Sequence, residues 1–380
     1  MGDCQARFRE KGGVKLPSTY STGIYRMKIL LQIALIFTGI SAYAQVSRED
    51  YLSDFDYGVQ MVEKVYSGYG QKVTAETLES YQQTKDSVRT AILNGSSTFE
   101  DAFGFYLAWF KDFHLHDVCG AQDKYMNGPV DYSSLMKYAP IDTYCTVDEK
   151  TFLIRYTSCV WSLKRKQWIK KALRSFRRSR CENLILDIRG NKGGAAGTSD
   201  AFIELLYDHD GYYNGVVIRN TPLNIGYFRK TMKKDKYWQK HLDRSEQSEE
   251  EYPVLFEPHI VHYEGVSTLP RKVAVIIDNN TASAAEEFLL ILQRVSDRVC
   301  VFGKDHSLGC LDYANAGRVT LPKTGYKFSL PLTCSMGLPQ TGIDTTGIVP
   351  DVTIPLNYPT SLTDNVDEWV YWVAKWLSKD

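Results

Sequence analysis

The spacing of hydrophobic residues changes near residue 138. Between residues 51 and 113, apolar side chains recur every three or four positions, for example in 55–65, which predicts a group of helices. A capping box at 97–100, Ser-Thr-Phe-Glu, is expected to open the last of these helices. Beyond residue 138, short apolar runs alternate with amphipathic stretches. The pattern therefore predicts a small helical domain followed by an α/β domain.

The clearest α/β unit lies between residues 151 and 188. The apolar runs 151–157 and 184–188 predict strands, and 164–180 between them has the spacing of an amphipathic helix. A strand, helix and strand in one sheet predict parallel pairing. The basic residues of this helix are interpreted as its solvated face, with a partner-docking surface as the alternative. Further strands are expected at 273–277, 298–302, 326–334 and 347–354, an exposed helical insertion or lid at 229–251, and an end helix at 368–377.

Ser283 lies where the apolar run 273–277 gives way to an Asn-rich turn and a helix-like segment. The first turn of a helix has backbone N–H groups without intrahelical partners and a positive dipole end, which would favour an oxyanion beside this hydroxyl. However, Ser283 and Glu286 also form a capping box, which requires no chemistry. This stretch alone leaves both a nucleophile and a helix cap open.

A glycine-rich loop, Arg189-Gly-Asn-Lys-Gly-Gly-Ala-Ala-Gly197, follows the strand at 184–188. Open α/β sheets bind ligands at the carboxyl ends of their strands, where glycine lets the backbone approach closely. The spacing fits neither common phosphate-binding motif. The loop is therefore either a tight turn or a source of N–H groups for an oxyanion.

Two histidines, His114 and His116, end the helical region in the sequence Asp112-Phe-His-Leu-His-Asp117. Alternate residues of an extended segment share a face and can bind a metal. No further ligand has recognisable spacing, so a structural histidine and a catalytic base are the stronger alternatives. No metal and no cofactor are expected.

The N-terminal region has the pattern of a targeting signal. Residues 27–44 combine a positive start, an apolar core and an Ala-x-Ala end, which predicts a secretory signal peptide cleaved after Ala44. Residues 1–26 are interpreted as a non-native extension. We expect a periplasmic or secreted protein without a membrane anchor after cleavage.

Composition narrows the possible partners. Lys plus Arg and Asp plus Glu number 45 each, so no overall field attracts nucleic acid. The cysteines that follow the signal peptide lack a C-x-x-C spacing, which argues against a zinc site.

Four motifs in order resemble the serine peptidase family of tail-specific (C-terminal processing) proteases and the tricorn core protease. They are Asp112-x-His114, the strand and loop at 184–194, Asn280-Thr-Ala-Ser-Ala-Ala-Glu286, and Gly347-Ile-Val-Pro-Asp351. The resemblance implies an α/β fold, a crotonase/ClpP-like core of ββα units, with a small N-terminal helical domain. It divides the chain into a helical domain at 45–118, a linker at 119–137 and a catalytic domain at 138–380. The linker region is too short for a PDZ domain.

The resemblance also implies site residues and a peptide or protein substrate. A lysine serves as base in the tail-specific enzymes, but Gly309 occupies its place here and Lys304 lies five positions early. The tricorn-like version instead implies Ser283 as nucleophile, His114 as general base and Asp344 as its orienting acid. Phe113 replaces the serine that precedes this histidine in tricorn. The expected oxyanion donors are the N–H groups of Ala284 and of Gly193 or Gly194, and the expected substrate-binding residues are Arg189 and Asn191.

The leading hypothesis is therefore an exported serine endopeptidase that acts by acyl transfer. A catalytically silent peptide- or ligand-binding protein on the same fold is the main alternative. A crotonase-type acyl-CoA enzyme is a third, which the predicted signal peptide disfavours.

Overall fold

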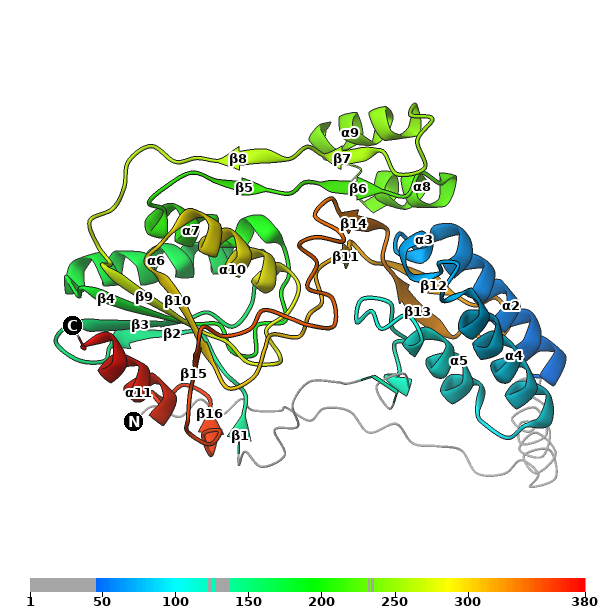
Figure 1. The fold of residues 1–380 in the computed structure, drawn as a ribbon, viewed down its shortest axis with the longest axis horizontal. Coiled ribbons are helices and arrows are strands. Elements are labelled where there is room, and N and C mark those ends of the chain that lie inside the picture. The colour runs from blue at the N-terminus through cyan, green and yellow to red at the C-terminus, as the bar shows by residue number, and fades with distance from the viewer. Residues whose placement is uncertain (1–45, 122–124, 127–136, 232, 234–235, 380) are drawn as a thin grey trace, which may run out of the picture. The chain divides into compact units, whose positions relative to one another are not determined.

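The computed structural model describes residues 46–121, 125–126, 137–231, 233 and 236–379 (Figure 1). Its largest sheet has six strands in the order β15-β10-β9-β4-β3-β2. All neighbouring strands run parallel except β2 and β3. The strands are β2 (Thr143–Thr146), β3 (Thr151–Arg155), β4 (Asn183–Asp187), β9 (Lys272–Ile276), β10 (Val299–Gly303) and β15 (Val352–Thr353). The predicted parallel unit is confirmed, with α6 (Leu163–Ser179) joining β3 to β4.

The two faces of this sheet carry different helices, because side chains alternate along each strand. Leu184 and Leu186 of β4 pack into a core shared with α6, α7 (Asp200–Leu206) and α10 (Ala284–Val295). Ile185 points to the opposite face, toward Trp369 of α11 (Glu368–Leu377). Figure 1 shows α6, α7 and α10 on one side of the sheet and α11 on the other. Burial on both faces explains why β4 reads as a continuous apolar run.

The N-terminal helices α2 (Arg48–Val65), α4 (Leu78–Asn94) and α5 (Phe99–Ala108) belong to a second core. This core also holds residues of five later elements, namely β6 (Val216–Ile218), α8 (Pro222–Thr231), α9 (Lys236–Glu246), β7 (Val254–Phe256) and β13 (Lys327–Leu330). For example, the ring centroids of Phe103 and Phe328 lie 5.2 Å apart. The chain from Arg48 onward forms one compact unit. The predicted boundary between domains at 45–118 and 138–380 therefore does not separate two cores, because the aromatic faces of the helices are buried by later segments.

Smaller elements complete the described chain. They are α3 (Tyr69–Lys72), β1 (Lys137–Tyr138), the 3-10 helix η3 (Ala196–Ser199), β5 (Gly211–Tyr213), β6 (Val216–Ile218), α8 (Pro222–Thr231), α9 (Lys236–Glu246), β7 (Val254–Phe256), β8 (His259–Val261), β11 (Tyr313–Ala314), β12 (Gly317–Thr320), β13 (Lys327–Leu330), β14 (Thr333–Ser335) and β16 (Ser361–Leu362). The predicted strand at 326–334 is thus two strands, β13 and the start of β14. The expected insertion is helical, and its function as a lid stays a prediction.

Helix ends follow local capping chemistry. The predicted capping box at 97–100 is wrong. The N-cap of α5 is Thr98, whose side chain accepts the N–H of Asp101 at 3.1 Å. Within the part of the chain that the structure describes, no helix is both long and apolar enough to cross a membrane. The predicted extension and signal peptide at 1–44, and most of the linker at 119–137, lie outside the described residues.

Candidate active site

Ser283 occupies the turn between β9 and α10, at the centre of the large sheet. Its backbone has φ 57° and ψ −124°, a conformation that costs a residue with a side chain about 1–3 kcal/mol. The turn is fastened to the loop after β4, because the Thr281 hydroxyl donates to the Ile188 carbonyl at 3.1 Å and the Ala282 N–H to the Asn191 carbonyl at 3.0 Å. Ser283 remains partly exposed. Strained, exposed serines at strand-to-helix turns are typical of nucleophiles.

His114 approaches Ser283 from the N-terminal part of the chain, in the turn after α5. Its Nε2 lies 3.2 Å from Ser283 Oγ, and its Nδ1 lies 2.5 Å from the carbonyl oxygen of Tyr313. A carbonyl can only accept, so Nδ1 carries the proton that points to Tyr313. In neutral His114 the lone pair on Nε2 therefore faces the serine hydroxyl, as a general base requires.

The position and protonation of His114 depend on Asp112. The Asp112 carboxylate accepts the backbone N–H of His114 at 2.8 Å and the hydroxyl of buried Tyr66 at 2.8 Å. Burial lowers the pKa of His114, whereas the Asp112 charge and the bond to Tyr313 oppose this shift. The net direction is downward, so the ring is mainly neutral at pH 7.

The glycine loop packs directly against Ser283. A Cβ on Gly193 would lie 2.8 Å from the Ser283 Cβ and 2.9 Å from the Ala284 nitrogen. The N–H of Gly193 donates to the Asn191 side chain at 3.0 Å. Among the described residues, no backbone or side-chain acceptor within 3.5 Å takes the N–H of Ala284 or of exposed Gly194. These two N–H groups fit the expected oxyanion pair better than Gly193 does.

Glu286 connects the start of α10 to the segment after β10. Its fully buried carboxylate accepts the N–H groups of Ser283, Gly309 and Cys310 at 2.9, 2.7 and 2.9 Å, and the hydroxyl of Ser307 at 2.6 Å. Burial raises the pKa of Glu286, and these bonds oppose the increase. The capping residue that the sequence indicates therefore also fixes the backbone of Ser283, while the Ser283 hydroxyl faces His114.

Asp344 is not bonded to His114 in the part of the chain that the structure describes. Its Oδ1 accepts the N–H groups of Asp312 and Leu311 at 3.0 and 3.3 Å, and its buried Oδ2 has no hydrogen-bond partner among the described residues. Burial, with the charges of Asp112 and Asp312, raises the pKa of Asp344 to about 8. The Tyr313 carbonyl already occupies Nδ1 of His114, so the orienting role of Asp344 stays a prediction.

Arg189 lies in the interior and does not face the site. With Arg155, Asp187 and Asp367 it forms a buried network of ion pairs at 2.7–2.8 Å, and its guanidinium stacks 5.1 Å from the ring centre of Trp369. Burial raises the pKa of Asp187, but the two guanidinium groups outweigh it and hold the pKa below its usual value. The prediction that Arg189 contacts substrate is therefore not supported, because its guanidinium is buried and paired with two carboxylates.

Asn191 is also buried and supports the loop. Its amide donates to the Tyr156 carbonyl at 3.0 Å, and its side-chain oxygen accepts from Gly193. Its polar atoms therefore have protein partners. The structure brings Ser283, His114, Ala284, Gly193 and Gly194 together, whereas Asn191 shapes the loop behind them.

Comparisons with known proteins identify the family of this chain. The model of peptidase family S41 matches residues 150–354, more than half of the chain. The chain belongs to peptidase family S41. As an S41 member it is a serine-type peptidase, and the matched region includes Ser283, the glycine loop and Asp344 but not His114.

Solved structures share the fold of this S41 chain. A candidate peptidase of Parabacteroides merdae is 16% identical, covers 83% of this chain and 91% of its own, and has a TM-score of 0.52. Mature CPAF is 11% identical, with 80% and 92% coverage and a TM-score of 0.55; a CPAF mutant is 10% identical, with 82% and 94% coverage and a TM-score of 0.59. A search among curated proteins finds no match. The predicted crotonase-like α/β fold is confirmed.

The structure of this S41 member disfavours a lysine base. Gly309 has φ 74°, and a Cβ there would lie 2.7–2.9 Å from backbone atoms of Ile343, Gly347 and Thr345. The ammonium of Lys304 donates to the Leu356 carbonyl at 3.2 Å. No lysine side chain fits at 309, and His114 is the base candidate beside Ser283.

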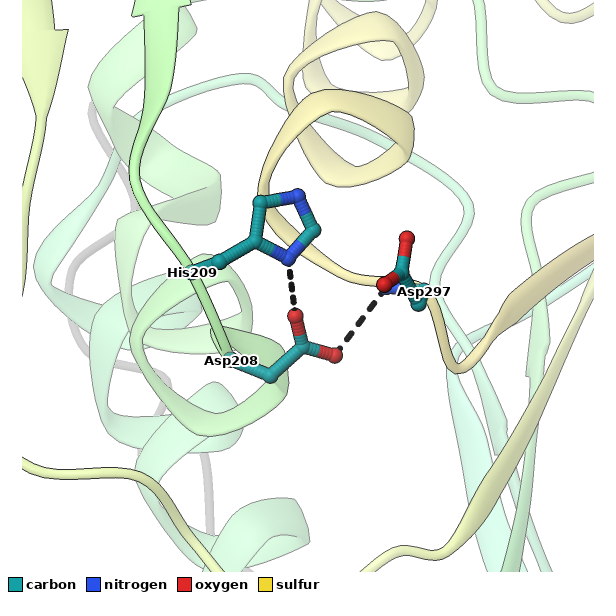
Figure 2. A group of neighbouring side chains, drawn as sticks. All are labelled: Asp208, His209 and Asp297. Atoms are coloured by element: carbon teal, nitrogen blue, oxygen red, sulfur yellow. Dashed lines mark hydrogen bonds and ion pairs between the residues drawn. The ribbon is translucent and has the colours of Figure 1, made fainter.

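One cluster elsewhere has the ligand types of a metal site. Figure 2 shows Asp208, His209 and Asp297, whose candidate ligand atoms all lie within 4.8 Å of one another. Asp208 already accepts the Ser296 hydroxyl at 2.9 Å, the Asp297 N–H at 3.0 Å and the Arg298 guanidinium at 3.3 Å. Asp208 therefore bonds the residues that follow α10, and the positive charge of Arg298 beside it disfavours the binding of a metal cation.

Sequence reasoning missed two groups that hold the base. Asp112 stood in the recognised Asp-x-His motif without a role, and a carboxylate two residues before a histidine is a signal that could have revealed it. The Tyr313 carbonyl is a backbone group, so no side-chain pattern marks it.

Proposed function

We propose that this S41 member is an exported serine endopeptidase in which Ser283 attacks the substrate and His114 acts as general base. The observation that carries the proposal is the 3.2 Å separation of His114 Nε2 and Ser283 Oγ. This distance is at the limit of good hydrogen-bond reach, which is common for catalytic pairs without substrate.

The reaction balances in two acyl-transfer steps. His114 takes the Ser283 proton while Oγ adds to the peptide carbonyl, and the proton then passes from His114 to the leaving amine as the C–N bond breaks. Water attacks the resulting acyl-enzyme with His114 again as base. This returns the Ser283 hydroxyl and releases the carboxylate product.

The oxyanion would be held by the N–H groups of Ala284 and Gly194. Removing one such donor typically costs about 10²–10³ in turnover. The positive end of the twelve-residue helix α10 (Ala284–Val295) adds a favourable field at the same point. The strained backbone of Ser283 keeps Oγ aimed at this space without reorganisation.

Export rests on residues 27–44, whose pattern is that of a signal peptide. A chain carrying its own start from Met27 is expected to be cut after Ala44. The N-terminus of the protein recovered from outside the cytoplasm would test this directly.

The activity is tested by incubating the chain from Gln45 with unfolded proteins and reading new termini by mass spectrometry. Ser283→Ala is the matched control, because it removes only Oγ and leaves the Ser283 N–H bond to Glu286. Termini present only with the unaltered chain would support the peptidase. Indistinguishable samples of folded protein would favour the silent binding protein.

A further inference from the structure

Three large apolar side chains are exposed where the segment after β3 meets α6, whose first residue is Leu163. Val160, Trp161 and Leu163 are 62%, 59% and 68% exposed. Single exposed apolar residues are ordinary, but neighbouring large ones mark contact surfaces. We call these three residues the apolar strip.

The two glycines of the loop link the backbone of Val160, at the start of the apolar strip, to the nucleophile. A Cβ on Gly194 would lie 2.4 Å from the Val160 nitrogen, and a Cβ on Gly193 would lie 2.8 Å from the Ser283 Cβ. Because successive Cα atoms are about 3.8 Å apart, the Val160 backbone is within about 12 Å of Ser283. An extended peptide advances about 3.3 Å per residue, so this distance corresponds to one to three residues of substrate.

The backbone beneath the apolar strip is held in place. The Cys159 N–H donates to the Gly193 carbonyl at 3.0 Å, and the Ala195 N–H donates to the Cys159 carbonyl at 2.9 Å. On the other side, the Ser162 hydroxyl caps α6 by accepting the Arg165 N–H at 3.0 Å. The strip is therefore presented from an ordered backbone, which reduces the entropy lost on binding.

We propose that the apolar strip, and Trp161 above all, binds an apolar side chain of the substrate one to three residues from the scissile bond. This inference rests on the proposed function and adds the substrate class: peptides with a large aliphatic or aromatic residue near the cut. Burial of such a side chain against Trp161 removes apolar surface of both partners from water. Peptides with small polar residues there gain nothing from the strip.

The test compares cleavage of a peptide series that carries Leu, Phe, Ser or Asn at each of the three positions on either side of the cut. Trp161→Ala is expected to lower kcat/KM about tenfold for the Leu or Phe peptides at the responsive position, mainly through KM. The Ser and Asn peptides should change less than twofold. Trp161→Phe should keep most of the preference, because it retains an aromatic side chain.

The matched control is Tyr371→Ala, an aromatic residue of α11 that is 56% exposed. It should leave all peptides unchanged. If Trp161→Ala lowers kcat/KM equally for every peptide, or for none, the proposal for the apolar strip is wrong while the proposed peptidase activity stands. Absence of cleavage by the unaltered chain would refute both proposals.

Vesicles of phosphatidylglycerol and phosphatidylcholine distinguish a membrane contact from a substrate contact, since basic residues follow the strip in α6. If Trp161→Ala abolishes vesicle binding and keeps the peptide preference unaltered, the strip contacts membranes and the proposal is wrong. A changed peptide preference without a change in vesicle binding would support it.

Discussion

Replacing Arg189 with methionine tests whether this residue supports the fold or contacts substrate. Arg189 is 1% exposed, bonds Asp187 and Asp367, and stacks on Trp369. Arg189→Met fills similar apolar space but leaves two buried carboxylates with Arg155 alone. Removing one partner of a buried ion network typically costs about 3–5 kcal/mol. We therefore expect the free energy of unfolding to fall by about 4 kcal/mol, which corresponds to a Tm lower by roughly 10 °C.

The assay is urea denaturation together with peptide kinetics well below the unfolding temperature. The midpoint should fall at constant m-value, and KM should stay within about twofold of the unaltered chain. Arg271→Met is the control, because Arg271 is largely exposed and pairs with Glu182 at 3.6 Å, so it should change stability by less than about 1 kcal/mol. Unchanged stability with a tenfold higher KM would show that Arg189 faces substrate and that the network is misassigned.

Three further predictions concern the site itself. His114 must be neutral to act as base and its pKa is lowered, so kcat/KM should fall on the acidic side with an apparent pKa below 6.5. Asp112→Asn removes the opposing charge and should lower this apparent pKa further, whereas an apparent pKa above 6.5 would contradict the lowered pKa of His114. Gly194→Ala should lower kcat at least about 100-fold, because Gly194 has φ 147° and a Cβ there would lie 2.3 Å from the Cys159 backbone. The control Gly226→Ala should stay active, because no atom lies within 4 Å of a Cβ at Gly226. Asp344 binds a proton more tightly in the folded state, so its contribution to the free energy of unfolding falls as the pH rises from 3.8 to about 8. Urea titrations across this pH range should show a smaller pH dependence for Asp344→Asn, and the same pH dependence in both proteins would refute the raised pKa.

Much of the sheet could be predicted because its strands carry strong local signals. The run at 184–188 is buried on both faces, so every position is apolar until Asp187, and the strand matches β4 within one residue. The end helix at 368–377 matches α11, since Asp367 supplies an N-cap and the apolar residues recur at helical spacing.

The domain boundary could not be predicted because it depends on contacts distant in sequence. Phe103 of α5 packs against Phe328, and Asp54 accepts N–H groups of Lys323 and Thr324. Each segment alone shows only that it has an apolar face. Which face covers which is set by the fold as a whole.

The candidate site divides in the same way. Ser283 and the glycines have local signatures, a turn between strand and helix and a need for positive φ, and these were found. The fate of Arg189 and the partner of His114 Nδ1 depend on distant groups, namely Asp367 and the Tyr313 carbonyl. The sequence of the glycine-rich loop alone does not distinguish an arginine that faces solvent from one that pairs with a buried carboxylate.

The most direct test of the central claim is covalent labelling of the folded chain with a fluorophosphonate, followed by peptide mapping. The account predicts a single adduct on Ser283, formed much more slowly in His114→Ala and not at all in Ser283→Ala. Labelling of another residue, or labelling of Ser283 that His114→Ala leaves unchanged, would contradict the pairing of these two side chains as nucleophile and base.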